Sequence, residues 1–136
     1  MNNIRLVWSV RTECGPTRNK NEDSVFPFKS GSGEPVFKAA VCDGLGGHVK
    51  GDIASKIAVS NMESNTSNLV ETINSANSKI LQYQEKNKES TGMGTTMTAI
   101  SIDANGLMEI GHIGDTRCYV FSDRKLLQLT QDHNVP

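Results

Sequence analysis

Alternating apolar and polar residues mark the amino-terminal part of the chain. Between positions 4 and 11 every second residue is apolar, with one further valine among the others. This period of two predicts a strand, and the polar stretch 12–20 that follows predicts a loop. Residues 24–28 and 36–42 are also rich in strand-forming side chains, and a Gly, Ser and Pro cluster at 30–35 separates them. We expect these two segments to form an antiparallel pair.

The period changes in the middle of the chain. Apolar residues recur three or four positions apart from 53 to 62 and again from 69 to 83, with polar residues on the other face. That spacing predicts two amphipathic helices, the second ending near Lys88. The Asn- and Ser-rich stretch 60–68 is expected to join them. The apolar positions are Ile53, Ile57, Ala58 and Met62 in the first helix, and Leu69, Ile73, Ala76, Ile80 and Tyr83 in the second.

Short extended segments return after the helices. Residues 97–102, 107–113, 118–122 and 125–129 have the composition of four strands joined by turn residues, which predicts a β-meander. Because the strands do not alternate with the helices, nothing demands a parallel sheet, and the predicted fold class is α+β. The sequence has no internal repeat, so we expect residues 1–136 to belong to a single domain.

Composition narrows the classes of partner. The chain has 14 basic and 15 acidic residues, a net charge of −1, and no basic stripe that a polyanion could contact. This argues against nucleic acid as a partner. The amino end lacks the apolar core of a secretory signal, and no apolar run approaches the ~20 residues needed to span a bilayer. We therefore expect a soluble, cytoplasmic protein with no membrane partner.

The three cysteines, Cys14, Cys42 and Cys118, are odd in number and lack Cys-x-x-Cys spacing. This pattern argues against a disulfide framework and against a zinc site. We expect all three to be reduced thiols, most of them buried.

Asp43 is the first candidate for chemistry. It follows a predicted buried strand and precedes the glycine-rich segment 44–47, so its carboxylate should project from a strand end into a loop that can bend sharply. A glycine at position 44 lets a backbone carbonyl approach an ion, and Mg²⁺ and Mn²⁺ prefer carboxylate, carbonyl and water oxygens. An ordinary Asp-Gly turn gives the same pattern and remains an alternative.

A phosphate-binding glycine loop is a further alternative for this segment. Residues 46–52 lack the Lys-Ser/Thr ending of a P-loop and do not match Gly-x-Gly-x-x-Gly. Asp43 would also repel a phosphate unless a metal lay between them. The pattern therefore favours a metal over direct nucleotide binding.

Upstream, Arg18 lies four residues before the adjacent carboxylates Glu22 and Asp23. The guanidinium can offer a planar fork to a phosphate dianion while a carboxylate helps to hold a cation, which is a division of labour expected in phosphoryl chemistry. Considered alone, the segment is better explained as a solvated polar loop.

Five short segments occur in a characteristic order along nearly the whole chain. They are Gly15-Pro16-Thr17-Arg18 with Asn21-Glu22-Asp23, Val41 to His48 with Gly51 and Ala54-Ser55, Gly94-Thr95-Thr96, Gly114-Asp115-Thr116-Arg117, and Leu129 to His133. In this order they resemble the amino-terminal signatures of type 2C protein phosphatases, the metal-dependent PPM family. The Gly-Gly-His form of the second segment is similar to that of bacterial members. The resemblance implies an αββα fold, in which helices flank a sandwich of two antiparallel sheets, and this chain would supply only part of it.

The resemblance implies a role for each matched residue. Asp43 matches the carboxylate that bridges two catalytic metal ions, and Gly44 matches the residue that offers its carbonyl. Glu22 matches a ligand of the second ion, and Asp23 matches a neighbouring carboxylate that supports metal-bound water. Arg18 matches the residue that grips the substrate phosphate.

The later segments have implied roles of their own. Asp115 matches a ligand of a third, weaker metal ion in bacterial relatives. Thr95, Thr96 and Arg117 are interpreted as structural, the threonines packing a strand and the arginine held in an ion pair. The implied cofactors are thus two catalytic Mn²⁺ or Mg²⁺ ions, with Asp115 serving a third.

The histidines are weaker candidates. Leu45 stands where many eukaryotic relatives have a histidine proposed as general acid, and leucine cannot donate a proton. His48 is not assigned that role. We interpret His112 and His133 as packing or hydrogen-bonding residues.

The implied function is hydrolysis of phosphoserine or phosphothreonine on proteins, by attack of metal-activated water and in opposition to a kinase. The sequence ends at Pro136, before two further aspartate motifs that complete the first metal site in this family. The alternative is therefore a catalytically inactive, phosphatase-like fragment that binds a partner or has no activity. We expect the 136-residue chain by itself to have little or no phosphatase activity.

Overall fold

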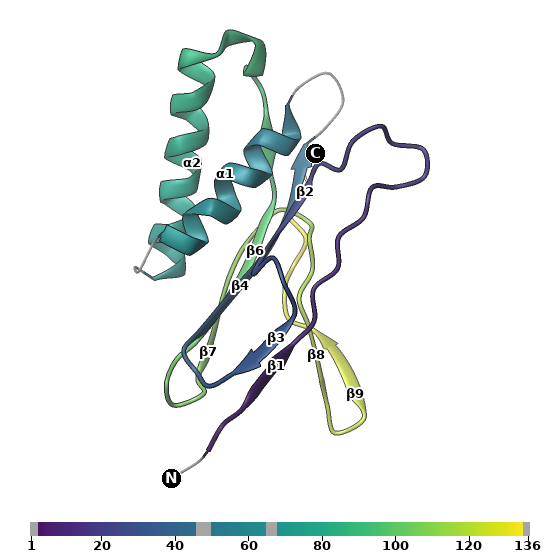
Figure 1. Cartoon of the computed structure of the whole chain (residues 1–136), viewed down its shortest axis with the longest axis vertical. Coiled ribbons are helices and arrows are strands. Elements are labelled where there is room, and N and C mark those ends of the chain that lie inside the picture. Colours follow the sequence, from purple (N-terminus) through teal and green to yellow (C-terminus); the bar gives the residue numbers. More distant parts are fainter. Residues whose placement is uncertain (1–2, 46–49, 65–67, 135–136) are drawn as a thin grey trace.

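A five-stranded antiparallel sheet forms the centre of the molecule in a computed structural model that describes residues 3–45, 50–64 and 68–134. Strands β2, β4, β6 and β7 lie side by side in that order, and β5 pairs with the end of β4 (Figure 1). The bounds are β2 Asp23–Phe26, β4 Phe37–Leu45, β5 Gly94–Thr95, β6 Met97–Ile102 and β7 Met108–Ile113. The predicted antiparallel pair before the helices is confirmed as β2 and β4.

Two helices cover one face of this sheet. Helix α1 (Gly51–Ser64) packs across β4 and β2, whereas α2 (Leu69–Lys86) packs beside it over β6 and β7 (Figure 1). Helix α2 begins where the Asn68 side chain accepts a hydrogen bond of 2.9 Å from the Glu71 amide. A short 3₁₀ turn, η1 (Lys88–Ser90), follows α2. The predicted α+β class is therefore confirmed.

The core lies between the helices and the sheet. Small side chains on the helix-facing side of β4 and β6 allow α1 and α2 to approach the sheet closely. Buried Asn61 of α1 donates to the Thr72 carbonyl at 2.7 Å, which fixes the two helices to each other. The core residues are Ala40, Cys42, Ala58, Val59, Met62, Leu69, Ala76, Met97 and Ala99.

The boundary between the helices differs from the prediction. Residues 60–64 belong to α1, so the predicted linker 60–68 is wrong over that part. The physical reason is that Asn61 and Met62 are buried, which extends the packed face of the helix by another turn. Asn68 is the cap of α2, and residues 65–67 lie outside the described residues.

The strands outside the main sheet form two small two-stranded sheets. Strand β1 (Leu6–Trp8) pairs with β3 (Gly31–Gly33), and β8 (Tyr119–Ser122) pairs with β9 (Lys125–Gln128). Strand β3 lies inside the Gly, Ser and Pro cluster at 30–35, which we expected only to separate the two strands of the predicted pair. Its glycines permit this because a Cβ on Gly31 would lie only 2.8 Å from the ring of Trp8.

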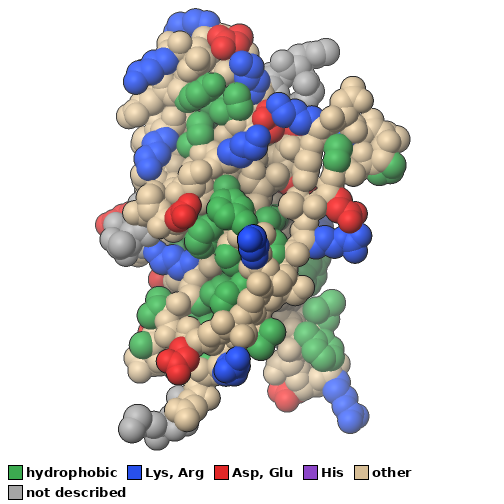
Figure 2. All heavy atoms as spheres, in the orientation of Figure 1, with side chains coloured by type: hydrophobic (Ala, Val, Ile, Leu, Met, Phe, Trp, Pro, Cys, Tyr) green, Lys and Arg blue, Asp and Glu red, His purple; other side chains and the backbone are tan. Residues whose placement is uncertain are grey.

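The predicted meander is wrong at its centre. Within the described residues, β7 and β8 are not paired, and the segment forms the β6–β7 and β8–β9 hairpins instead. Gly114, with φ of 105°, turns the chain out of the main sheet immediately after β7. The β8–β9 hairpin consequently projects from the sheet (Figure 1) and carries exposed hydrophobic side chains (Figure 2), among them Phe121 and Leu126.

The cysteines are less buried than expected. Cys42 is fully buried, but Cys118 is half-buried and Cys14 is exposed, so the prediction that most would be buried is wrong. Cys14 lies on the polar loop that precedes β2, where no core exists to cover it. Burial raises the pKa of the Cys42 thiol to about 12, which keeps that thiol protonated and unreactive. None of the helices among the described residues has the length and apolar character needed to cross a membrane.

Candidate metal centre and phosphate-binding site

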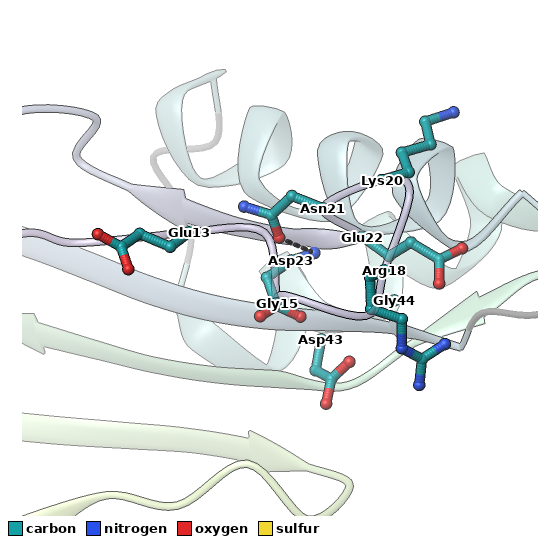
Figure 3. Close-up of a pocket in the computed structure, with 9 residues that line it drawn as sticks. All are labelled: Glu13, Gly15, Arg18, Lys20, Asn21, Glu22, Asp23, Asp43 and Gly44. Atoms are coloured by element: carbon teal, nitrogen blue, oxygen red, sulfur yellow. Dashed lines mark hydrogen bonds between the residues drawn. The ribbon is translucent and has the colours of Figure 1, made fainter.

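A cavity of about 340 Å³ opens where the loop before β2 meets the ends of β2 and β4 (Figure 3). It is lined by four acidic and two basic side chains together with smaller polar and glycine residues. The lining residues are Glu13, Gly15, Arg18, Lys20, Asn21, Glu22, Asp23, Asp43 and Gly44. The structure therefore brings the residues of the first two segments of the sequence pattern together in one place.

Two carboxylates face each other across the β2–β4 pair. In the antiparallel register Asp23 lies directly opposite Asp43, which brings two negative charges close together. Partial burial raises the pKa of Asp43, and the charge of Asp23 and a hydrogen bond with it raise the pKa further. The charges of Asp115 and Glu22 act in the same direction but more weakly. Such a group of like charges is destabilising unless a cation or a proton neutralises it.

Asp43 lies within β4, which continues to Leu45, so the prediction that it projects from a strand end is wrong. The reason is that β5 extends the pairing beyond it. The Asp43 amide donates to the Thr96 hydroxyl at 3.0 Å, and its carbonyl accepts from the Thr96 amide at 2.9 Å and from the Thr95 hydroxyl at 3.1 Å. The two threonines are structural, as predicted, and specifically they hold the backbone of Asp43.

Gly44 is required by close packing of the backbone. A Cβ on this residue would lie 2.3 Å from the Gly51 carbonyl oxygen and 2.6 Å from that of Glu22. Its amide donates to the Glu22 carbonyl at 3.1 Å. Thus glycine at position 44 allows β4, the loop before β2 and the start of α1 to meet. Ligation of an ion by the Gly44 carbonyl stays a prediction.

Glu22 is anchored through its backbone. Its carbonyl also accepts a hydrogen bond of 2.6 Å from the hydroxyl of Ser55, a fully buried residue of α1. In Figure 3 the Glu22 carboxylate points away from the Asp23 and Asp43 side chains. The assignment of Glu22 as a metal ligand stays a prediction. Sequence reasoning missed the role of Ser55, although the residue lies in one of the recognised segments.

Arg18 lies on an exposed turn of the loop, where its amide donates to the Gly15 carbonyl at 3.0 Å and its carbonyl accepts from the Cys14 thiol at 3.3 Å. Figure 3 shows its guanidinium and the Asp43 carboxylate extending to the same side of the cavity. Among the residues that the structure describes, no carboxylate forms an ion pair with this guanidinium. Arg18 is therefore available to bind an anion beside the carboxylates.

Comparison with known proteins identifies the family. Residues 16–135 match the family described as Protein phosphatase 2C. The chain belongs to this family. It is 36% identical over 138 residues to the serine/threonine phosphatase stp of Listeria monocytogenes, covering 92% of the chain and 54% of that relative. The chain thus spans about half the length of this relative.

Solved structures of the family share the fold. The serine/threonine phosphatase PstP/Ppp of Mycobacterium tuberculosis is similar with a TM-score of 0.71 and 32% identity, over 95% of the chain and 54% of that structure. Stp1 from Staphylococcus aureus has a TM-score of 0.72 and 26% identity, over 98% and 55%. The catalytic domain of PstP, with a TM-score of 0.71 and 32% identity over 95% of the chain and 55% of that structure, has been solved in complex with two manganese ions. The implied type 2C phosphatase fold is confirmed.

The donor groups of the cavity fit a hard divalent cation. In residues 3–45, 50–64 and 68–134, no three His, Cys, Asp or Glu side chains lie close enough together to hold an ion by themselves. Mg²⁺, however, commonly binds through one or two carboxylates, keeps several waters and takes further oxygens from a substrate phosphate. Asp23 and Asp43, with Arg18 nearby for the phosphate, match that requirement.

The remaining predicted residues, apart from His48, lie in the carboxyl-terminal part of the chain. Asp115 acts on Asp43 through its charge, which places it near the centre without testing whether it binds a metal. Arg117 forms the predicted ion pair, with Asp132 at 2.7 Å. His112 and His133 form hydrogen bonds, as predicted, the first with Thr98 and the Gln131 carbonyl and the second with the Gly114 amide. His48 lies outside the described residues.

Proposed function

We propose that this chain provides the amino-terminal part of a metal-dependent phosphatase that hydrolyses phosphoserine and phosphothreonine on proteins. The observation that carries the proposal is the arrangement of Asp23 opposite Asp43 in a cavity that Arg18 also lines. Membership of the protein phosphatase 2C family and the two manganese ions bound by the PstP catalytic domain support it.

Each residue has a defined task in this proposal. Asp43 and Asp23, with Glu22, Asp115 and the Gly44 carbonyl as further oxygen donors, would hold the ions. When bound, Mn²⁺ or Mg²⁺ supplies a Lewis acid that lowers the pKa of water and neutralises phosphoryl oxygens.

Arg18 orients the substrate. Its guanidinium offers two parallel N–H groups to two phosphoryl oxygens, which fixes the phosphate in line for attack and lowers its negative charge. Because the cavity opens at the surface and its walls are polar, it suits a phosphorylated side chain carried by a protein segment. The relatives named serine/threonine phosphatases support the choice of residue, and the opposing enzyme would be a serine/threonine kinase.

The proposal is tested in the chain extended through the two downstream aspartate motifs of the family. We expect Mn²⁺-dependent hydrolysis of a phosphothreonine peptide, and we expect Arg18→Ala to raise KM on the order of tenfold or more, since one charged hydrogen-bond partner is worth about 1.5–3 kcal/mol. Arg5→Ala is the matched control, because the Arg5 guanidinium donates to the Ser32 hydroxyl at 3.1 Å beside the β1–β3 pair and does not line the cavity. Equal turnover by Arg18→Ala and the parent would remove Arg18 from the site, and metal-independent hydrolysis would overturn the proposed function.

A further inference from the structure

The loop that carries Arg18 has few attachments to the rest of the molecule. Residues 11–20 are all exposed. Most of the polar contacts they form stay within the loop or its immediate end, such as Arg11 with Glu13, Thr12 with Asn21, and Cys14 with the Arg18 carbonyl. Among the hydrogen bonds and ion pairs of the described residues, a single one joins residues 11–20 to another part of the fold. It is the ion pair of Lys20 with Asp52, at 2.8 Å.

Asp52 is placed to serve as a fixed attachment point. Its side chain is only 5% exposed, in the first turn of α1, whereas the Lys20 side chain is 61% exposed. A buried carboxylate without a partner is energetically costly, so Asp52 favours conformations in which a lysine contacts it. Lys56, one helical turn further on, contacts the same carboxylate oxygen at a longer distance of 3.5 Å.

The same turn of α1 is tied to the candidate metal centre by contacts that do not involve Lys20. The Ser55 hydroxyl donates to the Glu22 carbonyl, and Gly51 lies in such close contact with Gly44 that neither residue has room for a side chain. The first turn of α1 is therefore at a fixed position relative to β4 and its Asp43. A loop attached to this turn is therefore also held at a fixed position relative to Asp43.

We propose that Asp52 is a positioning residue that, through Lys20, holds the loop bearing Arg18 at a defined position relative to Asp43. This inference rests on the proposed function for its kinetic consequence, but the attachment itself is a property of the chain. Without the ion pair, the loop samples positions in which the guanidinium is out of reach of a phosphate bound beside Asp43. Apparent affinity falls in proportion to the fraction of molecules in which the loop is correctly placed.

The first experiment measures the attachment by hydrogen exchange of the Arg18 amide, which donates to the Gly15 carbonyl within the loop, in the 136-residue chain. We expect Lys20→Met and Asp52→Asn each to speed this exchange about tenfold or more, because exchange follows the fraction of molecules in which the loop is open, and that fraction rises from about a tenth or less to about nine-tenths when the loop is correctly placed a tenth as often. Lys56→Met is the matched control, since it removes the other lysine at the same carboxylate and leaves the loop contact intact. Of the two test variants, Lys20→Met perturbs folding less, because the Lys20 side chain is mostly exposed. If Lys20→Met and Asp52→Asn exchange no faster than Lys56→Met, the attachment does not exist.

The second experiment measures the consequence for the site, in the chain extended through the downstream motifs. Lys20→Met and Asp52→Asn should raise KM for a phosphothreonine peptide, and the inhibition constant of inorganic phosphate, about tenfold, with kcat changed less than twofold. Lys20→Arg, which keeps the positive charge at position 20, should leave both values close to those of the parent. A fall in kcat with unchanged KM, or faster exchange with unchanged phosphate affinity, would overturn the positioning role. Absence of hydrolysis by the parent would instead refute the proposed function, and the exchange measurement would still decide the attachment.

Discussion

Replacing Asp43 by Asn should stabilise the metal-free chain and abolish its response to metal. The substitution keeps the size of the side chain and the backbone hydrogen bonds to Thr95 and Thr96, and it removes one of two negative charges that face each other across the β2–β4 pair. Its effect on stability therefore reports the repulsion between these charges.

The magnitude follows from the geometry. Directly opposed residues in an antiparallel pair have Cβ atoms about 5 Å apart, and unit charges at that separation repel by about 1 kcal/mol in a water-like dielectric. Asp43 is exposed on one side, so solvent screening argues for this low figure and against the larger values of a buried pair. A gain of about 1 kcal/mol corresponds to a rise in Tm of about 4 °C for a domain of this size.

The assay is thermal unfolding at pH 7, first with a chelator and then with Mn²⁺. At 100 times its Kd, an ion stabilises the form that binds it by about 2.7 kcal/mol, so the order of the two proteins should reverse when Mn²⁺ is added. Asp123→Asn is the control, since Asp123 lies in the β8–β9 turn with φ of 50°, a conformation that Asn tolerates. The reasoning is refuted if Asp43→Asn lowers the Tm of the metal-free chain, or if Mn²⁺ raises the Tm of both proteins equally.

The raised pKa of Asp43 predicts how the stability gained by Asp43→Asn depends on pH. A carboxyl whose pKa is higher in the folded chain than its ordinary value of 3.8 destabilises the fold while it is ionised, at pH above the folded pKa. As the pH falls through the folded pKa, protonation removes the repulsion. The stability gained by Asp43→Asn should therefore be largest near neutral pH and shrink as the pH approaches 3.8.

Three further predictions concern the surroundings of the site. Thr96→Val removes the hydroxyl that accepts from the Asp43 amide, and urea denaturation should show a loss of about 1–3 kcal/mol. Gly44→Ala places a Cβ 2.3 Å from the Gly51 carbonyl oxygen, so the backbone must shift, and we expect a loss of stability above about 2 kcal/mol together with weaker Mn²⁺ binding by calorimetry. Burial tends to raise the pKa of Asp52, but its lysine partners lower the pKa overall. The stability that the ionised carboxylate provides is therefore present above its ordinary pKa and is lost as the pH falls through the folded pKa. The free energy of unfolding, measured between pH 5 and about 2, should depend less on pH in Asp52→Asn than in the parent.

The sequence by itself determined the class of fold and the identity of the family. Hydrophobic periodicity depends on residues that are near one another in the chain, so a period of two along 4–11 and a period near 3.6 along 69–83 predicted a strand and a helix that the structure contains. The order of the short segments was sufficient for the family, because residue types and spacing can be compared without knowing which residues meet in space. Local patterns also indicated Arg18 and Asp43 as members of one site.

The tertiary structure alone decided how these residues meet. The register that sets Asp23 opposite Asp43 joins residues 20 positions apart, and the threonines that hold Asp43 lie more than 50 positions downstream. Periodicity shows which face of a strand is buried but not which strand is its partner, so the β1–β3 pair and the division of the meander could not be predicted. The role of the buried Asp52 could not be predicted from the sequence, because Lys20 lies in a loop that three intervening strands separate from α1. Its role depends on the packing of α1 against the sheet, where long-range contacts bring the two charges together.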